Sequence, residues 1–280
     1  MKARVAWCAA VLAGGVLAGQ AVAQAPGGPP TVTITASPTA VSVGATGAIP
    51  AGPTRLDMVR AAGAPDTDVY VALLVPGVTI DQLTRTLAVE DRTGGESSLG
   101  LVSLQASAAI VGRETHRAMT LTLKPGLTYV VVAEPDAESN GKAKQRSVTT
   151  FSTSGAANGA TAPAPAATVR MQGLRFRGPS TLPRRGTVNF ENRDGVAHFA
   201  LAFPLRKGTT RQRLGRALRS GESAIGRIVA GPPYMAQNVL SGGDTGNAQE
   251  LSFPAKGRYG LICFINGHDR LGMYRVITVK

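Results

Sequence analysis

The residues best suited to chemistry lie close together near the C-terminal end of this 280-residue chain. Cys263, His268 and Met273 follow one another as Cys-x4-His-x4-Met, and a further histidine, His198, begins the apolar segment HFALAF. One thiolate, two imidazoles and one thioether are soft donors that suit copper, held by two histidines and a cysteine with a long, weak bond to methionine. The spacing therefore predicts one copper ion bound by these four residues.

Two strands and a loop are needed to bring these donors together. Alternating residues predict a strand over 259–264, Asn266 and Gly267 predict a turn, and residues 274–279 predict the last strand. A loop between two strands delivers three donors to one end of a β-sandwich. His198 can reach the same end from the start of a neighbouring strand.

Two motifs resemble the cupredoxins of the plastocyanin and azurin type over the last 110 or so residues: Asn192-x-Asp194-x3-His198 and Tyr259-x3-Cys263-x4-His268-x3-Gly272-Met273. The resemblance implies a type 1 (blue) copper, one-electron transfer, and ligand roles for the four donors. The chain departs from the family in the Cys–His loop, where Asn266-Gly267 replaces the usual proline. It also has Phe199 after the first histidine, where the family often has asparagine. Because residues around the ligands tune a metal, these departures bear on potential and colour.

The composition predicts an all-β fold. The chain has 34 Gly and 18 Pro among many Val and Thr residues, which favours short strands and turns. Residues 52–87 resemble 183–218, and residues 121–134 resemble 251–264, in the same order along the chain. We predict a duplication, with two tandem Greek-key β-sandwich domains of cupredoxin-like fold and short helical insertions.

Four regions follow from these patterns. Residues 1–23 are typical of a signal peptide, with a basic start, an apolar run and a small-residue cleavage site. Residues 24–152 form a cupredoxin-like domain, residues 153–166 an uncharged linker, and residues 167–280 the copper domain. The expected location is the periplasm or the extracellular space. No later segment is apolar enough to span a membrane.

The first domain lacks the donors. Ala133 aligns with Cys263, and Val69 and Tyr70 lie near the place of His198. No histidine or cysteine occurs between Glu134 and the linker. The first domain is therefore predicted to keep the fold without the metal.

The histidine count argues against an enzyme. The chain has three histidines, and His116, the one outside the motifs, is predicted to be an exposed polar residue. Multicopper oxidases and copper nitrite reductases also use tandem cupredoxin domains, but their catalytic coppers need several further histidines. We predict an electron carrier in which electrons leave through the edge of His268, because its loop exposes it. The alternatives are a copper-binding or chaperone protein without redox turnover and a metal-free cupredoxin-like scaffold.

Charge is shared unevenly between the two halves, with a net charge of −1 over residues 24–164 and +12 over 165–280. A short helix is predicted at 210–220, capped by Thr209 or Thr210 and ended by Gly221. Its leucines, Leu214 and Leu218, face inward. It carries four arginines: Arg211, Arg213, Arg216 and Arg219. This charge suits an acidic redox partner or simply a solvated face; export argues against nucleic acid.

Overall fold

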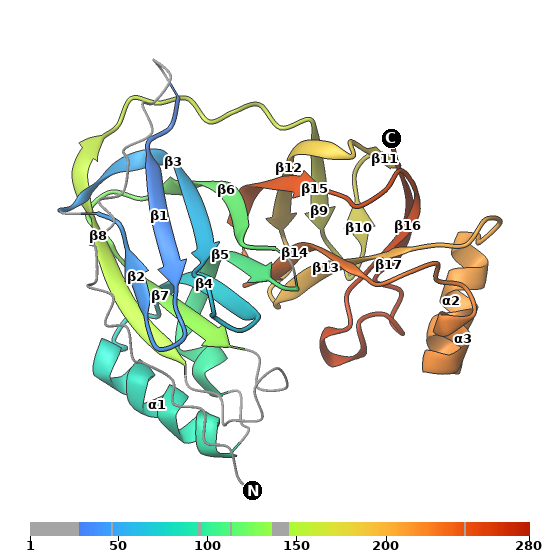
Figure 1. Cartoon of the computed structure of the whole chain (residues 1–280), viewed down its shortest axis with the longest axis horizontal. Coiled ribbons are helices and arrows are strands. Elements are labelled where there is room, and N and C mark those ends of the chain that lie inside the picture. Colours follow the sequence, from blue (N-terminus) through green and yellow to red (C-terminus); the bar gives the residue numbers. More distant parts are fainter. Residues whose placement is uncertain (1–27, 46, 94–96, 113, 136–145, 244) are drawn as a thin grey trace, which may run out of the picture.

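The computed structural model describes residues 28–280 apart from 46, 94–96, 113, 136–145 and 244. The predicted signal peptide lies outside the described residues. Within them, no helix is long and apolar enough to cross a membrane. Two β-rich halves lie side by side, and the predicted all-β, tandem-sandwich architecture is confirmed (Figure 1).

Domain one is built from eight strands and a helix of 14 residues. Its elements are β1 (Thr31–Ala36), β2 (Val41–Val43), β3 (Ile49–Arg60), β4 (Thr67–Leu74), α1 (Ile80–Thr93), η1 (Ser97–Gly100), β5 (Val102–Ile110), β6 (His116–Leu123), β7 (Thr128–Pro135) and β8 (Ser147–Ala157). Alternate residues of these strands are buried in one apolar core, because side chains along a strand point to opposite faces.

Domain two repeats the plan with nine strands. Its elements are β9 (Ala167–Met171), β10 (Phe176–Arg177), β11 (Thr181–Leu182), β12 (Arg185–Asn192), β13 (His198–Pro204), α2 (Arg211–Ser220), α3 (Glu222–Gly226), β14 (Tyr234–Leu240), β15 (Thr245–Ser252), β16 (Gly257–Ile262), η3 (Ile265–Gly267) and β17 (Tyr274–Val279). Its sheets have the orders β10-β9-β12-β15 and β11-β17-β16-β13-β14, with a second apolar core.

Strand pairing is the same in the two domains. In domain one, β1 is parallel to β3, β3 antiparallel to β6, and β4 antiparallel to both β5 and β7. In domain two, β9 is parallel to β12, β12 antiparallel to β15, and β13 antiparallel to both β14 and β16. The last strands, β8 and β17, pair with β7 and β16. The predicted duplication is confirmed by this repeated order.

The helices are capped alike. Thr79 accepts a hydrogen bond from the Gln82 N–H, and Thr210 accepts one from the Arg213 N–H, each at 3.1 Å. Such a side-chain cap satisfies an N–H group that has no partner in the first turn. Gly221 ends α2 with a φ of 93°, in the left-handed region that suits glycine. The helix predicted at 210–220 is therefore confirmed, and Thr210 rather than Thr209 is its cap.

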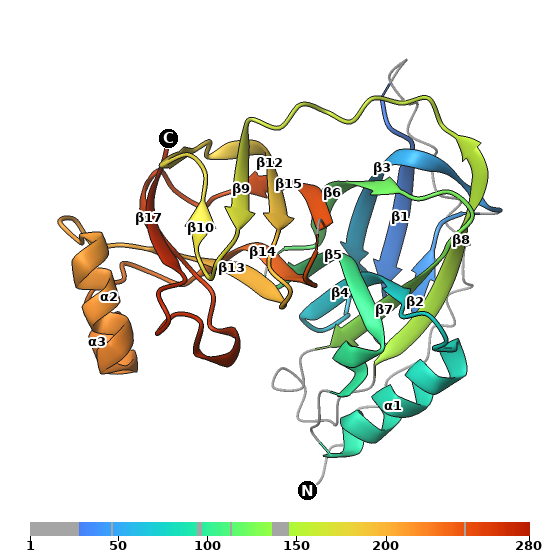
Figure 2. The same cartoon turned by 180° about the vertical axis from the view of Figure 1, so that it is seen from behind.

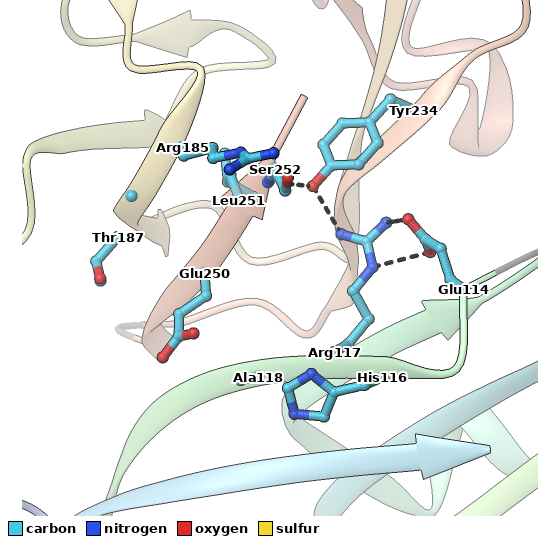
Figure 3. Close-up of a pocket in the computed structure, with 11 residues that line it drawn as sticks. Glu114, His116, Arg117, Ala118, Arg185, Thr187, Tyr234, Glu250, Leu251 and Ser252 are labelled. Atoms are coloured by element: carbon cyan, nitrogen blue, oxygen red, sulfur yellow. Dashed lines mark hydrogen bonds and ion pairs between the residues drawn. The ribbon is translucent and has the colours of Figure 1, made fainter. Parts of the chain in front are cut away.

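The two domains join edge to edge through equivalent strands. Strand β6 pairs antiparallel with β15, and Met119 lies opposite Gln249, so one sheet continues across both domains. Figure 3 shows a second contact, in which Arg117 donates to the Tyr234 hydroxyl at 2.9 Å and forms an ion pair with Glu114. The two domains are therefore in direct contact through strand pairing and side chains, in addition to the segment of chain that links them.

The predicted linker begins later than expected. Strand β8 continues to Ala157, five residues into the predicted segment 153–166. The chain from 158 to 166 contains no helix or strand and runs along the side opposite α1 (Figures 1 and 2). Pairing of β8 with β3 explains the shift, because Thr153 lies opposite Ile49 and Ala157 lies opposite Ala51 in that parallel ladder.

Candidate metal centre

Three predicted donors meet at one end of domain two. The sulfur of Cys263 lies 3.6 Å from Nδ1 of His268 and 3.9 Å from Nδ1 of His198, and the two Nδ1 atoms are 3.2 Å apart. Among the described residues these three form a group of potential metal ligands whose donor atoms all lie within 4.8 Å of one another. One ion can touch all three donors.

The strands deliver the donors from two directions. His198 is the first residue of β13, and Cys263 directly follows the end of β16. The Cys263 N–H donates to the Met273 carbonyl at 3.2 Å, and the Met273 N–H donates to the His268 carbonyl at 2.9 Å. The loop is thus closed by its own backbone. Met273 is fully buried and packs in the same core as Cys263.

Three positions with positive φ, at Asn266, Gly267 and Gly272, allow the loop to turn. Asn266 has a φ of 47°, and asparagine tolerates this region better than most residues. Gly272, directly before Met273, has a φ of 100°, and a Cβ there would lie 2.2 Å from the guanidinium of Arg175. Arg175 donates to the Gly272 carbonyl at 3.0 Å. The turn predicted at Asn266 and Gly267 is confirmed, and the φ of Gly272 is one that residues with a Cβ rarely adopt, so glycine suits this position.

A carboxylate orients the first histidine. Asp194 Oδ2 lies 2.9 Å from His198 Nε2, and Asp194 also accepts backbone N–H bonds from Gly173 and Leu174. Burial raises the pKa of Asp194, but these hydrogen bonds lower it by more than burial raises it, so the pKa lies below its ordinary value. The ionised carboxylate turns Nδ1 of His198 toward the other donors, because its hydrogen bond to Nε2 fixes the orientation of the ring.

Asn192 anchors the loop that carries Asp194. Its buried Nδ2 donates to the carbonyls of Val196, Leu240 and Ser241, between 2.8 and 3.0 Å. Its Oδ1 accepts a bond from the Asp194 N–H at 3.1 Å. The sequence motif contained both residues, but neither was predicted as part of the site. Their spacing before His198 was the available signal.

Burial sets the protonation of the donors. Burial lowers the pKa of His198, and the hydrogen bond to Asp194 offsets this only in part. Burial also raises the pKa of the Cys263 thiol, although backbone N–H groups of Phe199 and Ile265 point at the sulfur and lower it. The histidine is therefore kept neutral and able to coordinate, whereas the thiol must lose its proton to a bound metal.

One expectation about the site is wrong. We expected the loop to expose an edge of His268 through which electrons could leave. The residue is buried, with 6% of its surface exposed. His116, in contrast, is exposed as predicted, with 46% of its side chain accessible. It lies beside Asp57 in domain one.

The donor set fits copper. Two imidazoles and one buried thiol are the donors that a mononuclear copper site of the trigonal His2Cys kind requires. Hard ions such as magnesium and calcium need oxygen donors. Domain two is a β-sandwich whose His198, Cys263 and His268 form a group that could hold one metal ion, and their chemistry suits copper.

No model of a known protein family matches this chain, and a search of curated proteins finds no match. Among solved structures, auracyanin B is 22% identical over 43% of this chain and 93% of its own, with a TM-score of 0.26. Auracyanin A, a blue copper protein from Chloroflexus aurantiacus, is 22% identical over 40% and 96%, with a TM-score of 0.27.

A copper-containing nitrite reductase from Thermus scotoductus is 14% identical over 92% of this chain and 69% of its own, with a TM-score of 0.25. All three TM-scores are below 0.5, so the likeness carries no argument about function. The fold and the donor set rest on the strand pairing and the distances within this chain.

Proposed function

We propose that this chain is an exported carrier of single electrons, with one type 1 copper in residues 167–280. The observation that carries the proposal is the meeting of one thiol and two imidazoles, all buried, with donor atoms within 4.8 Å of one another. When bound there, copper supplies a one-electron couple. Burial in a rigid sandwich suits electron transfer, because the site then changes little between oxidation states.

Each donor has a separate role in the proposal. Cys263 provides the soft anionic ligand, and His198 and His268 provide the two imidazoles. Met273 is the proposed long axial ligand, held next to them by its backbone bonds to Cys263 and His268. Asp194 keeps His198 in place, and the N–H groups of Phe199 and Ile265 stabilise a thiolate at Cys263.

Copper delivery is the weaker alternative. A protein that hands its metal to another must let a partner's ligands reach the ion. His198 is fully buried, as is Cys263, and His268 is 6% exposed. Electrons can leave such a site without exposed ligands, whereas a metal ion cannot.

The proposed redox partner is acidic. The arginines of α2 are exposed, and Leu214 and Leu218 are buried against domain two. Helix α2 lies at the end of domain two remote from domain one (Figures 1 and 2), so its positive charge faces open solvent. Such a field steers association, and its effect weakens as salt concentration rises.

A redox titration tests electron transfer directly. Copper-loaded chain is reduced anaerobically in small steps and then reoxidised with a one-electron oxidant. The expected result is bleaching of the copper absorption by one electron per chain and full recovery on reoxidation. Release of the copper on reduction, detected with a Cu(I) chelator in the filtrate, would support delivery and contradict an electron carrier.

A further inference from the structure

Three asparagines of the chain are followed directly by glycine: Asn140, Asn158 and Asn266. An Asn-Gly pair is chemically labile, because glycine has no Cβ and its backbone nitrogen can approach the asparagine side chain closely. Asn140 lies outside the described residues, whereas the other two are described and have different surroundings. The same dipeptide can therefore be compared in two structural settings.

The side chain of Asn158 is held in place. Its Nδ2 donates to the Pro53 carbonyl at 2.8 Å, and its Oδ1 accepts a bond from the Ala160 N–H at 2.9 Å. A Cβ at Gly52 would lie 2.8 Å from that Oδ1, so the amide also packs closely against β3. Attack by the Gly159 nitrogen requires the side chain to turn, which would break both hydrogen bonds.

Asn266 lies in the loop between Cys263 and Met273 and has no such restraint. Its side chain is exposed, and no described residue forms a hydrogen bond or ion pair with its amide. The loop projects from the sheet in Figure 1, and Asn266 borders a cavity of about 610 Å³ that both domains line. A Cβ at Gly267 would meet nothing within 4 Å, so the backbone next to the amide is unobstructed.

The backbone nitrogen of Gly267 is weakly held. Its N–H donates to the Phe264 carbonyl over a long distance of 3.3 Å, whereas the N–H of the next residue, His268, donates to the Ile265 carbonyl at 2.9 Å. A hydrogen bond weakens as it lengthens beyond its usual range. The nitrogen can therefore leave its partner and reach the side chain of Asn266 at a lower cost than a tightly bonded amide.

We propose that Asn266 is a site of spontaneous deamidation, with water as the co-reactant. The Gly267 nitrogen forms a bond to the side-chain carbonyl carbon of Asn266, and the bond from that carbon to Nδ2 breaks. Ammonia leaves with the proton of the Gly267 N–H. Water then opens the cyclic imide at either carbonyl and gives aspartate or isoaspartate. Both products are negatively charged, and the ammonia takes up the proton that they release.

The modified loop would differ in charge and in length. Isoaspartate routes the backbone through the former side chain and so inserts a methylene group between Cys263 and His268. The donor atoms of these two residues lie 3.6 Å apart in the unmodified loop. We therefore expect the isoaspartyl chain to bind copper less tightly. This consequence rests on the proposed function, whereas the deamidation itself does not.

Ageing of the full-length, metal-free chain at neutral pH without oxygen tests the modification. Peptide mapping by mass spectrometry follows each Asn-Gly pair separately. The expected result is conversion of Asn266 at least about 10-fold faster than that of Asn158, equivalent to about 1.4 kcal/mol in the activation barrier. In concentrated urea the two rates should become equal, because unfolding removes the contacts of Asn158. Absence of conversion at Asn266, or equal rates in the folded chain, would overturn the proposal.

Variants assign the reaction to one residue. Asn266→Gln should abolish isoaspartate outside the peptide that contains Asn140, because glutamine closes a larger ring far more slowly. Asn158→Gln is the matched control and should leave the conversion of Asn266 unchanged. Circular dichroism confirms that each variant folds. If aged Asn266→Gln contains as much isoaspartate outside that peptide as wild type, the assignment to Asn266 is overturned.

Copper affinity tests the consequence. The isoaspartyl and unmodified fractions of aged wild-type chain are separated by ion exchange and compared in a Cu(I) chelator competition. The isoaspartyl fraction is expected to bind about 10-fold more weakly, as when groups that orient a metal ligand are displaced. Equal affinities, with normal copper binding by fresh chain, would overturn only this consequence. Fresh chain that binds no copper would refute the proposed function, and the mapping result would still decide the deamidation.

Discussion

The two domains share one scaffold but differ at the end where the metal donors meet. The strand registers place Thr67 where domain two has His198, and Ala133 where it has Cys263. Thr67 is buried and its hydroxyl donates to the Pro65 carbonyl, so it serves the local turn. Neither a threonine nor an alanine can replace a soft metal donor.

The features common to both domains belong to the fold. Tyr129 and Tyr259 are both fully buried in equivalent strands, and each hydroxyl makes a backbone hydrogen bond, with the Lys124 N–H and the Ala255 carbonyl. Both domains also have a threonine-capped helix after equivalent strands, with α1 after β4 and α2 after β13. The comparison shows that the sandwich forms without the donors and that the chemistry resides in a few substituted positions.

Removal of the Cys263 thiol has the largest expected effect on the difference between the two domains. Cys263→Ser is expected to lower Cu(I) affinity by at least about 100-fold, because a serine hydroxyl is hard and far less acidic than a thiol. A chelator competition measures the affinity. The matched control is Ala133→Ser, at the equivalent place in domain one, which should leave copper affinity unchanged. Equal effects of the two substitutions would contradict separate roles for the domains.

Removal of the orienting carboxylate should have the next largest effect. Asp194→Asn is expected to weaken copper binding about 10-fold to 100-fold, because the amide cannot hold the His198 ring as a carboxylate does. Glu191→Gln, which breaks a surface ion pair with Arg170 near the same loop, is the control. If the copper affinity and visible spectrum of Asp194→Asn match those of wild type, Asp194 does not position His198.

The contribution of the buried Glu90, which contacts Arg146 and Ser98, can be tested through the free energy of unfolding. Burial raises the pKa of Glu90, but hydrogen bonds from Ser98 and Arg146 lower it more, leaving it below the ordinary 4.5. Glu90 therefore contributes stability that is present above pH 4.5 and is lost as the pH falls through its lowered value. Glu90→Gln is expected to cost roughly 1–3 kcal/mol at pH 7 and to flatten the acid decline.

Urea unfolding of the metal-free chain between pH 3 and pH 7 measures this prediction. Glu222→Gln in domain two serves as the control and should reproduce the wild-type profile. An unchanged acid profile in Glu90→Gln would show that the buried carboxylate does not stabilise domain one.

The proposed axial ligand should have the smallest effect. Met273→Leu is expected to keep copper bound and to shift or raise the reduction potential, because the thioether bond is long and weak. Potentiometry against the wild-type chain measures the shift, with Met235→Leu in β14 as a methionine control. Complete loss of copper in Met273→Leu would mean that the ligand set has been assigned wrongly.

Much of the local structure could be predicted because it depends on neighbouring residues. Thr210, the N-cap, directly precedes the helix Arg211–Ser220, and Gly221, where the helix ends, directly follows it. The final strand, 274–279, also has the predicted bounds. Cys263 and His268 lie in one loop, so their spacing alone indicated that these two donors would meet.

The features that could not be predicted depend on distant residues. Met119 and Gln249 pair across the domain junction although 130 positions separate them, and no local pattern specifies that edge contact. The burial of His268 and the hydrogen bond of Asp194 to His198 likewise depend on how packed elements meet. The cavity beside the site is formed by both domains, so neither domain's sequence indicates it.

The central claim is that domain two holds one type 1 copper and domain one holds none. Its most direct test is the visible absorption spectrum of the full chain after copper loading and removal of free metal, with the bound copper counted in the same sample. The account predicts one copper per chain and an intense thiolate-to-Cu(II) band in the red region of the visible spectrum. A chain that binds copper but stays colourless, or that binds two blue coppers, would contradict it.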